Sequence, residues 1–125
     1  MSYGYAVEFL KGSLEKYTQS RSESSLAISL KEKCIDELAF EEAYIDSVGN
    51  MIATKGNGEP RILLCGHMDT VPGSIPVRIQ DGYIYGRGAS DAKASLISML
   101  LAASEFPKQR GTIIFAAVVD EEGNA

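Results

Sequence analysis

The sequence is short of basic residues and long apolar runs, and each shortage excludes a class of protein. Twelve lysines and arginines face seventeen acidic residues, for a net charge of −5 at pH 7. No basic cluster interrupts this balance, so we expect no nucleic-acid partner. No apolar run approaches the ~20 residues of a membrane span, and the start, MSYGYAVEFLKGSLEKY, lacks the regions of a signal peptide. A cytoplasmic protein with no membrane segment is therefore expected.

Cysteine is also scarce. Cys34 and Cys65 are far apart and form no Cys-x-x-Cys pair, which argues against a zinc knuckle or a redox motif. Both lie within apolar patterns, so two buried thiols are expected. Cys65 stands two residues before His67 and shares its strand face, so a role as a metal ligand is the open alternative.

The rest of the composition is that of a globular domain with a packed core, at 45% hydrophobic and 23% charged residues. A chain of 125 residues fits one domain or part of one. Periodicity and turn residues predict helices at 5–17, 22–38 and 90–106, a hairpin of strands 42–46 and 50–54, an exposed hairpin at 77–86 that turns at Asp81-Gly82, and strands at 61–67 and 113–120.

Two of these elements decide the fold class. The runs RILLCGH and IIFAAVVD are apolar without alternation, which is typical of strands covered on both faces, so we expect two central parallel strands. A helix lies between them, and the resulting β-α-β unit predicts an α/β fold. The string SRSES at 20–24 is expected to cap the second helix.

His67 and Asp69 come at the carboxyl end of the first apolar strand, the edge where α/β sheets gather their ligand sites. Alternation places both side chains on one side, and a carboxylate there can accept from a metal-bound imidazole and fix its tautomer. For two such residues alone, a purely structural pair is the more frequent interpretation.

A second feature is Asp91, which opens the helix that crosses over from the His67 strand and therefore lies at the same end of the sheet. A plain N-cap role for Ser90 or Asp91 is the simpler alternative, with Lys93 as a solvated helix residue.

The third feature is the run Asp120-Glu121-Glu122 after the second parallel strand. Acidic runs usually only solvate a loop. Here, however, like charges crowd at the sheet edge that holds His67, and a bound cation relieves their repulsion. The sequence therefore predicts a metal site at this edge.

Three strings, GHMDTVPG at 66–73, YGRGASDAK at 85–93 and VVDEEG at 118–123, resemble in order and spacing the N-terminal motifs of the two-zinc amidohydrolase and metallopeptidase family of acetylornithine deacetylase and succinyl-diaminopimelate desuccinylase. DSVGNMIA at 46–53 extends the match. The resemblance implies a three-layer α/β catalytic domain with a mostly parallel central sheet flanked by helices. Residues 1–125 would be the N-terminal part of that single domain, without its C-terminal part or the dimerisation domain.

Carried over by motif position, the resemblance makes His67 a ligand of one zinc ion, Asp91 a bridge between two, and Glu122 a ligand of the other. Glu121 would be the general base and Asp69 would orient His67. The family reaction is amide hydrolysis with two Zn²⁺, for which Co²⁺ is a substitute. The chain departs from the pattern at Ala94, where Gly is common, and in having a single histidine. Each zinc would then have two of three protein ligands, so the chain alone is expected to be inactive.

The implied substrate is a small N-acylated amino acid, such as acetyl-ornithine or acetyl-lysine, or a carrier-linked lysine or ornithine, within lysine or arginine biosynthesis. The motifs look closest to the archaeal and thermophile branch that acts on carrier-linked substrates. A homodimer is expected for the full-length protein. Two alternatives stay open: a zinc di-, amino- or carboxypeptidase of the same family, and a non-catalytic truncated module.

Overall fold

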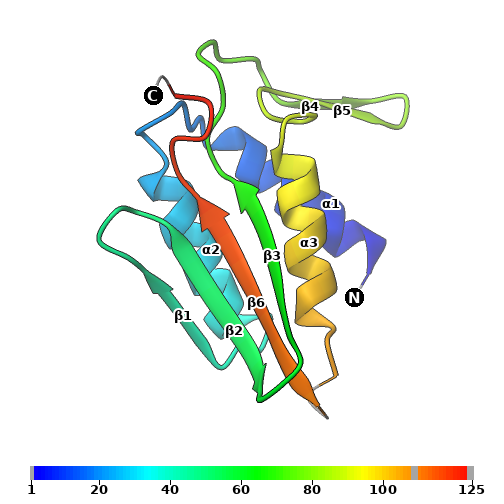
Figure 1. The fold of residues 1–125 in the computed structure, drawn as a ribbon. Helices are drawn as coiled ribbons and strands as arrows, with labels where there is room; N and C mark the ends of the chain where they lie inside the picture. The colour runs from blue at the N-terminus through cyan, green and yellow to red at the C-terminus, as the bar shows by residue number, and fades with distance from the viewer. Residues whose placement is uncertain (1, 108–109, 124–125) are drawn as a thin grey trace.

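The computed structural model describes residues 2–107 and 110–123. Its central sheet has four strands in the order β1-β2-β6-β3, and a two-stranded hairpin, β4-β5, stands apart from it (Figure 1). The elements are, in chain order, α1 (Tyr3–Glu15), α2 (Ser24–Asp36), β1 (Glu42–Ile45), β2 (Met51–Asn57), β3 (Arg61–His67), β4 (Arg78–Gln80), β5 (Tyr83–Tyr85), α3 (Lys93–Ser104) and β6 (Gly111–Val118). No helix among the described residues has the length and apolar character needed to cross a membrane.

One face of the sheet is covered by the helices. Met51 and Ala53 of β2 and Phe115 of β6 are fully buried. They share that face because Ala53 pairs with Phe115, and Met51 is two residues from Ala53 on a strand whose side chains alternate. Leu30 of α2 and Leu100 of α3 belong to the same buried cluster, to which α1 also contributes. Each fully buried leucine or phenylalanine stabilises the fold by about 1.5–3 kcal/mol.

The predicted β-α-β unit is confirmed. β3 and β6 pair in parallel, from Arg61 opposite Thr112 to His67 opposite Val118, and α3 lies between them in the chain. Gly66 explains how close this helix comes, since a Cβ there would stand 2.8 Å from Cε of Met99. The glycine next to His67 therefore lets α3 pack directly on β3, which fixes where α3 begins relative to that histidine.

The α/β class, with a central sheet flanked by helices, is confirmed, but three details of the expectation need correction. Two of the three strand pairings are antiparallel, so the sheet of the described residues is not mostly parallel: the hairpin β1-β2 is added to β6 through β2. β3 is an edge strand rather than a covered one, and Leu63 on it is 62% exposed. All three helices contribute to the cluster on one face, so residues 2–107 and 110–123 supply only part of the expected three layers.

The ends of the elements follow local chemistry. Asp81 and Gly82 both have positive φ, as the predicted tight turn of β4-β5 requires. The predicted cap of α2 is wrong: its N-cap residue is Glu23, which makes no side-chain capping bond. α3 begins at Lys93 instead of Ser90, because the preceding residues form a turn that carries Asp91.

Candidate metal centre

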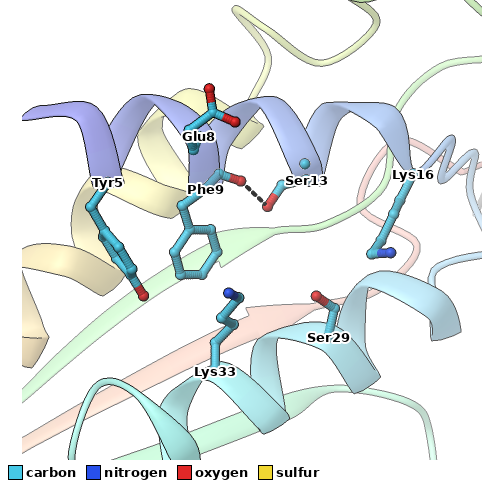
Figure 2. Close-up of a pocket in the computed structure, with 8 residues that line it drawn as sticks. Tyr5, Glu8, Phe9, Ser13, Lys16, Ser29 and Lys33 are labelled. Carbon is cyan, nitrogen blue, oxygen red and sulfur yellow. Dashed lines mark hydrogen bonds between the residues drawn. The ribbon is translucent and has the colours of Figure 1, made fainter.

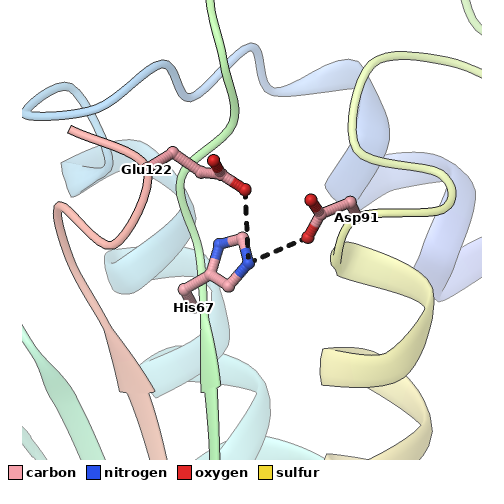
Figure 3. A group of neighbouring side chains, drawn as sticks. All are labelled: His67, Asp91 and Glu122. Atoms are coloured by element: carbon pink, nitrogen blue, oxygen red, sulfur yellow. Dashed lines mark hydrogen bonds and ion pairs between the residues drawn. The ribbon is translucent and has the colours of Figure 1, made fainter.

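Three separate parts of the chain meet at the carboxyl edge of β3 and β6. His67 is the last residue of β3, Asp91 lies in the turn before α3, and Glu122 follows β6 (Figure 3). Because β3 and β6 are parallel neighbours, both end at this edge, and α3 starts from the same side. The expected convergence of the three residues is confirmed, since one imidazole or carboxylate atom from each lies within 4.8 Å of the others.

The imidazole of His67 stands at the centre of this group. Its Nε2 atom is 3.1 Å from Oδ1 of Asp91, 3.7 Å from Oε2 of Glu121 and 3.9 Å from Oε1 of Glu122. Its Nδ1 atom lies 2.8 Å from the main-chain carbonyl oxygen of Asp69. Donation from Nδ1 to that carbonyl leaves the Nε2 lone pair directed at the space between the carboxylates, which is the form of histidine that binds a metal.

Asp69 has a broader role than the sequence predicts. Its carboxylate is fully buried and lies 3.4 Å from Nδ1 of His67, but it is the main-chain carbonyl of Asp69 that accepts the hydrogen bond from the ring. The carboxylate instead accepts the N–H groups of Glu121 and Glu122 and the hydroxyl of Ser20. Burial opposes ionisation of Asp69, but these hydrogen bonds outweigh it and hold the pKa of Asp69 below its ordinary value.

The charges around His67 favour a cation. Burial alone would lower the pKa of His67, but its hydrogen bonds to Asp69 and Asp91 and the charges of Asp69 and Glu121 raise it overall. The pKa of Glu122 is also raised, first by its side-chain hydrogen bond with Asp91 and then by desolvation and the neighbouring negative charges. Several carboxylates thus crowd one imidazole, and a divalent metal ion bound between them relieves that repulsion.

The donor set fits a borderline-soft divalent ion such as Zn²⁺, which binds imidazole nitrogen and carboxylate oxygen. The two adjacent glutamates differ in exposure: the side chain of Glu121 is 56% exposed and that of Glu122 is 23% exposed. The more enclosed carboxylate suits a metal ligand. The more open one suits a group that exchanges protons with water or substrate.

Two depressions adjoin Glu122 and leave room for a small substrate. One, of about 310 Å³, includes Ser20 and Asp120, and the other, of about 240 Å³, includes Arg87 and Asp91. A separate groove of about 300 Å³ runs between α1 and α2, away from the metal ligands (Figure 2). The ammonium of Lys33 in this groove lies over the ring of Phe9 and forms an ion pair with Glu37, so it already has two partners.

Lys93 of the second motif is not a solvated helix residue. Its side chain is 1% exposed and its ammonium donates to the main-chain carbonyl oxygens of Ser13 and Lys16 at the end of α1. Burial lowers the pKa of Lys93 to about 8. Lys93 therefore ties the start of α3, next to Asp91, to the C-terminal end of α1, where unpaired carbonyl groups favour a cation.

The sequence missed two further residues at this edge, Ser20 and Glu23. The string SRSES looks like a helix cap, yet the hydroxyl of Ser20 donates to Asp69 and the carboxylate of Glu23 accepts the N–H of Asp120 in the acidic run after β6. The expectation for Cys65 also fails in part: Cys34 is buried, whereas Cys65 is exposed, because β3 is an edge strand. Among the described residues, Cys65 does not belong to the converging group.

The comparisons with known proteins agree with this geometry. The sequence model of peptidase family M20/M25/M40 matches residues 63–125, which include the three converging residues. The chain belongs to this family. A putative LysW-lysine/LysW-ornithine hydrolase of Pyrococcus furiosus is 49% identical over 117 residues, which are 94% of this chain and 34% of the relative. LysW-lysine hydrolase of Deinococcus radiodurans is 45% identical over 69 residues, 54% of this chain and 19% of that protein.

Solved structures of two peptidases share the fold. Aminopeptidase PepT of Bacillus cereus superposes with a TM-score of 0.77 at 28% identity, over 98% of this chain and 38% of that one. The M20 metallo-carboxypeptidase Sso-CP2 of Sulfolobus solfataricus superposes with a TM-score of 0.72 at 23% identity, over 98% of this chain and 32% of that one. The chain thus spans about a third of the length of the Pyrococcus furiosus relative and of these two solved structures.

Proposed function

We propose that the complete protein containing these residues is a zinc-dependent amidohydrolase that releases lysine or ornithine from an amide-linked acyl or carrier group. The observation that carries this proposal is the convergence of one imidazole and several carboxylates at the carboxyl edge of β3 and β6. The identity to LysW-lysine and LysW-ornithine hydrolases over 94% of the chain supports the substrate class. The carrier-linked amino acid is therefore the first substrate to test.

In this proposal His67, Asp91 and Glu122 hold the metal. Asp91 lies 3.1 Å from Nε2 of His67, offers a carboxylate oxygen within 4.8 Å of Glu122 and is the most exposed of the three, which suits a carboxylate that bridges two ions. The bound zinc would polarise the scissile carbonyl and lower the pKa of the attacking water. The described residues give each of two ions two ligands, and the remaining ligands would come from the rest of the length seen in the relatives. Zinc should accordingly bind the 125-residue chain much more weakly than the complete protein.

Glu121 is the proposed general base. Its main chain is fixed by Asp69, while its carboxylate remains more than half exposed and lies 3.7 Å from Nε2 of His67. A carboxylate so placed can take a proton from the attacking water and deliver it to the leaving amine of lysine or ornithine. Glu122, more enclosed, stays on the metal. A cytoplasmic homodimer remains our expectation for the complete protein.

The test is hydrolysis by the complete protein after chelation and reconstitution with Zn²⁺. The substrates are lysine and ornithine amide-linked to a carrier, their N-acetyl derivatives, and a panel of di- and tripeptides. We expect zinc-dependent release of free lysine or ornithine from the first two groups. Faster cleavage of peptides would support a peptidase of the same family instead. Stoichiometric zinc without hydrolysis of any of these substrates would support the non-catalytic alternative.

A further inference from the structure

Three consecutive main-chain amides after β6 are held by two buried carboxylates. The N–H of Asp120 donates to Oε2 of Glu23 at 2.7 Å, and the N–H groups of Glu121 and Glu122 donate to Oδ1 and Oδ2 of Asp69 at 3.0 and 2.8 Å. Glu23 is 4% exposed and Asp69 is fully buried. The turn that carries the two glutamates belongs to no helix or strand, so these bonds replace regular hydrogen bonding there.

Ser20 extends this set by one step. Its hydroxyl donates to Oδ2 of Asp69 at 2.6 Å, the same oxygen that accepts the N–H of Glu122. A hydrogen bond to an ionised carboxylate is stronger than one between neutral groups, and it orients the carboxylate plane. The position of Ser20 therefore influences where the two carboxylate oxygen atoms of Asp69 accept the N–H groups of Glu121 and Glu122.

The segment that carries Ser20 and Glu23 is itself anchored beside β3. The hydroxyl of Thr18 donates to the main-chain carbonyl of Met68, and the N–H of Thr70 donates to the carbonyl of Thr18. Thr18 is fully buried. Residues 18–23 thus reach the acidic turn from a fixed position next to the end of β3.

The main-chain carbonyl of Glu23 accepts the N–H groups of Leu26 and Ala27 in the helix that follows, but the side chains of Ser20 and Glu23 bond elsewhere. α2 begins at Ser24, and its N-cap residue Glu23 makes no side-chain capping bond. Burying a carboxylate is unfavourable unless hydrogen bonds compensate, and the carboxylate of Glu23 accepts a hydrogen bond from the amide of Asp120. The side chain of Ser20 therefore bonds to Asp69, and that of Glu23 bonds to the acidic turn, rather than to α2.

We propose that Ser20 and Glu23 are positioning residues of the metal centre: they hold the amides of residues 120–122, directly or through Asp69, and so set where the carboxylates of Glu121 and Glu122 stand relative to His67. Displacing a catalytic group by ~1 Å costs about 100-fold in rate. The catalytic consequence rests on the proposed function, whereas the hold on the main chain does not depend on it.

The first readout is amide hydrogen exchange in the metal-free complete protein. Ser20→Ala should speed exchange at Glu121 and Glu122, and Glu23→Ala should speed it at Asp120, each by about 10- to 100-fold. Ser13→Ala is the matched control, because the buried hydroxyl of Ser13 donates to the carbonyl of Phe9 on α1, away from the turn. It should leave exchange at the turn unchanged.

The second readout is zinc affinity and turnover of the reconstituted protein. Ser20→Ala and Glu23→Ala should each lower zinc affinity or kcat by about 10- to 100-fold, with a smaller change in KM. Ser20→Thr keeps a hydroxyl and Glu23→Gln keeps an acceptor oxygen, so both should restore most of the loss.

The outcomes separate the two proposals. Exchange at residues 120–122 no faster in Ser20→Ala and Glu23→Ala than in Ser13→Ala would overturn the positioning role. So would faster exchange with zinc affinity and kcat both unchanged, or conservative variants as impaired as the alanine variants. If Glu23→Ala does not fold, Ser20→Ala decides alone, since Ser20 is only partly buried. A parent protein that neither binds zinc nor hydrolyses the substrates would refute the proposed function. The exchange experiment would still show whether Ser20 and Glu23 restrain the main chain of residues 120–122.

Discussion

The helix-covered core and the carboxyl edge of the sheet adjoin each other on β6, yet different interactions stabilise them. In the core, Phe115 packs with Leu30 and other apolar side chains, an interaction that depends on volume and has little directional preference. At the edge, the buried groups are polar: Asp69 and Glu23 accept hydrogen bonds whose geometry fixes neighbouring main-chain atoms. Substitutions in the core should therefore act on folding, and substitutions at the edge should act on metal binding and catalysis.

The largest expected effect is at the edge and separates two adjacent residues. In the complete protein, Glu121→Gln should lower turnover by about 10²- to 10⁴-fold, some 3–5.5 kcal/mol, or more if Glu121 also protonates the leaving amine. Its zinc content should stay near that of the parent. Glu122→Gln should lose zinc, because Glu122 is the more enclosed carboxylate of the converging group. Turnover and bound zinc, measured for both variants, check this division.

The control for that pair is their thermal unfolding without metal, which neither substitution should shift strongly, since both side chains lie outside the core cluster. Wild-type turnover in Glu121→Gln would contradict the general-base role. Zinc loss in Glu121→Gln as severe as in Glu122→Gln would show that both glutamates are ligands.

The next effect belongs to the core. Leu30→Ala should lower the free energy of unfolding by about 2–5 kcal/mol, since Leu30 is fully buried and the substitution leaves a cavity. Leu63→Ala is the same change at a position 62% exposed on the edge strand, where we expect less than about 0.5 kcal/mol. Urea unfolding of the two variants measures the difference. Equal losses would mean that Leu63 is more enclosed than this structure shows.

The same comparison explains what the sequence could predict. The order of the predicted elements and the spacing of apolar residues located β3, α3 and β6 in the sequence. Because β3 and β6 pair in parallel, His67 and Glu122 then lie at the same edge of the sheet. These are consequences of local pattern and of the β-α-β connection. Asp91 was placed for the same reason, since it lies just before the helix of the crossover connection.

What the sequence could not predict depends on contacts between distant segments. An apolar run such as RILLCGH reads the same in an edge strand as in a central one, so the exposure of Leu63 and Cys65 was missed. Likewise, Ser20 and Glu23 have the spacing of a helix cap, and only the packing of residues 18–23 beside β3 brings Ser20 to Asp69 and Glu23 to the acidic run. The buried Lys93 was missed because its partners are main-chain carbonyls of α1.

A smaller effect tests the core through pH. Burial raises the pKa of the Cys34 thiol from 9.0 to about 12. Above pH 9 the unfolded chain therefore binds fewer protons than the folded chain, and stability falls as pH rises toward 12. Between pH 8 and 10 this should cost roughly 1 kcal/mol relative to Cys34→Ala, whose own cavity effect is independent of pH.

Urea unfolding of both proteins at pH 8 and pH 10 measures that difference. The pKa of Tyr5 is raised to about 12, first by burial, then by Glu37 and least by the charge of Cys34, so Tyr5 titrates in both proteins and most of its contribution cancels in the comparison. A wild-type chain that loses no more stability than Cys34→Ala over this interval would show that the thiol ionises in the folded state as readily as in the unfolded one.

The smallest expected effect concerns Cys65, which the sequence left open as a metal ligand. Cys65 precedes His67 by two residues on β3, a separation of about 6.6 Å along the strand, whereas a zinc–thiolate bond is about 2.3 Å long. The Nε2 atom of His67 is directed at Asp91 and Glu122, at the strand end. Cys65→Ala should therefore change zinc affinity of the complete protein by less than about twofold, and the Co²⁺-substituted protein should show no thiolate-to-metal absorption band. A tenfold loss of affinity, or a thiolate band that disappears in Cys65→Ala, would place this sulfur among the ligands and would require β3 to end differently in the metal-bound protein.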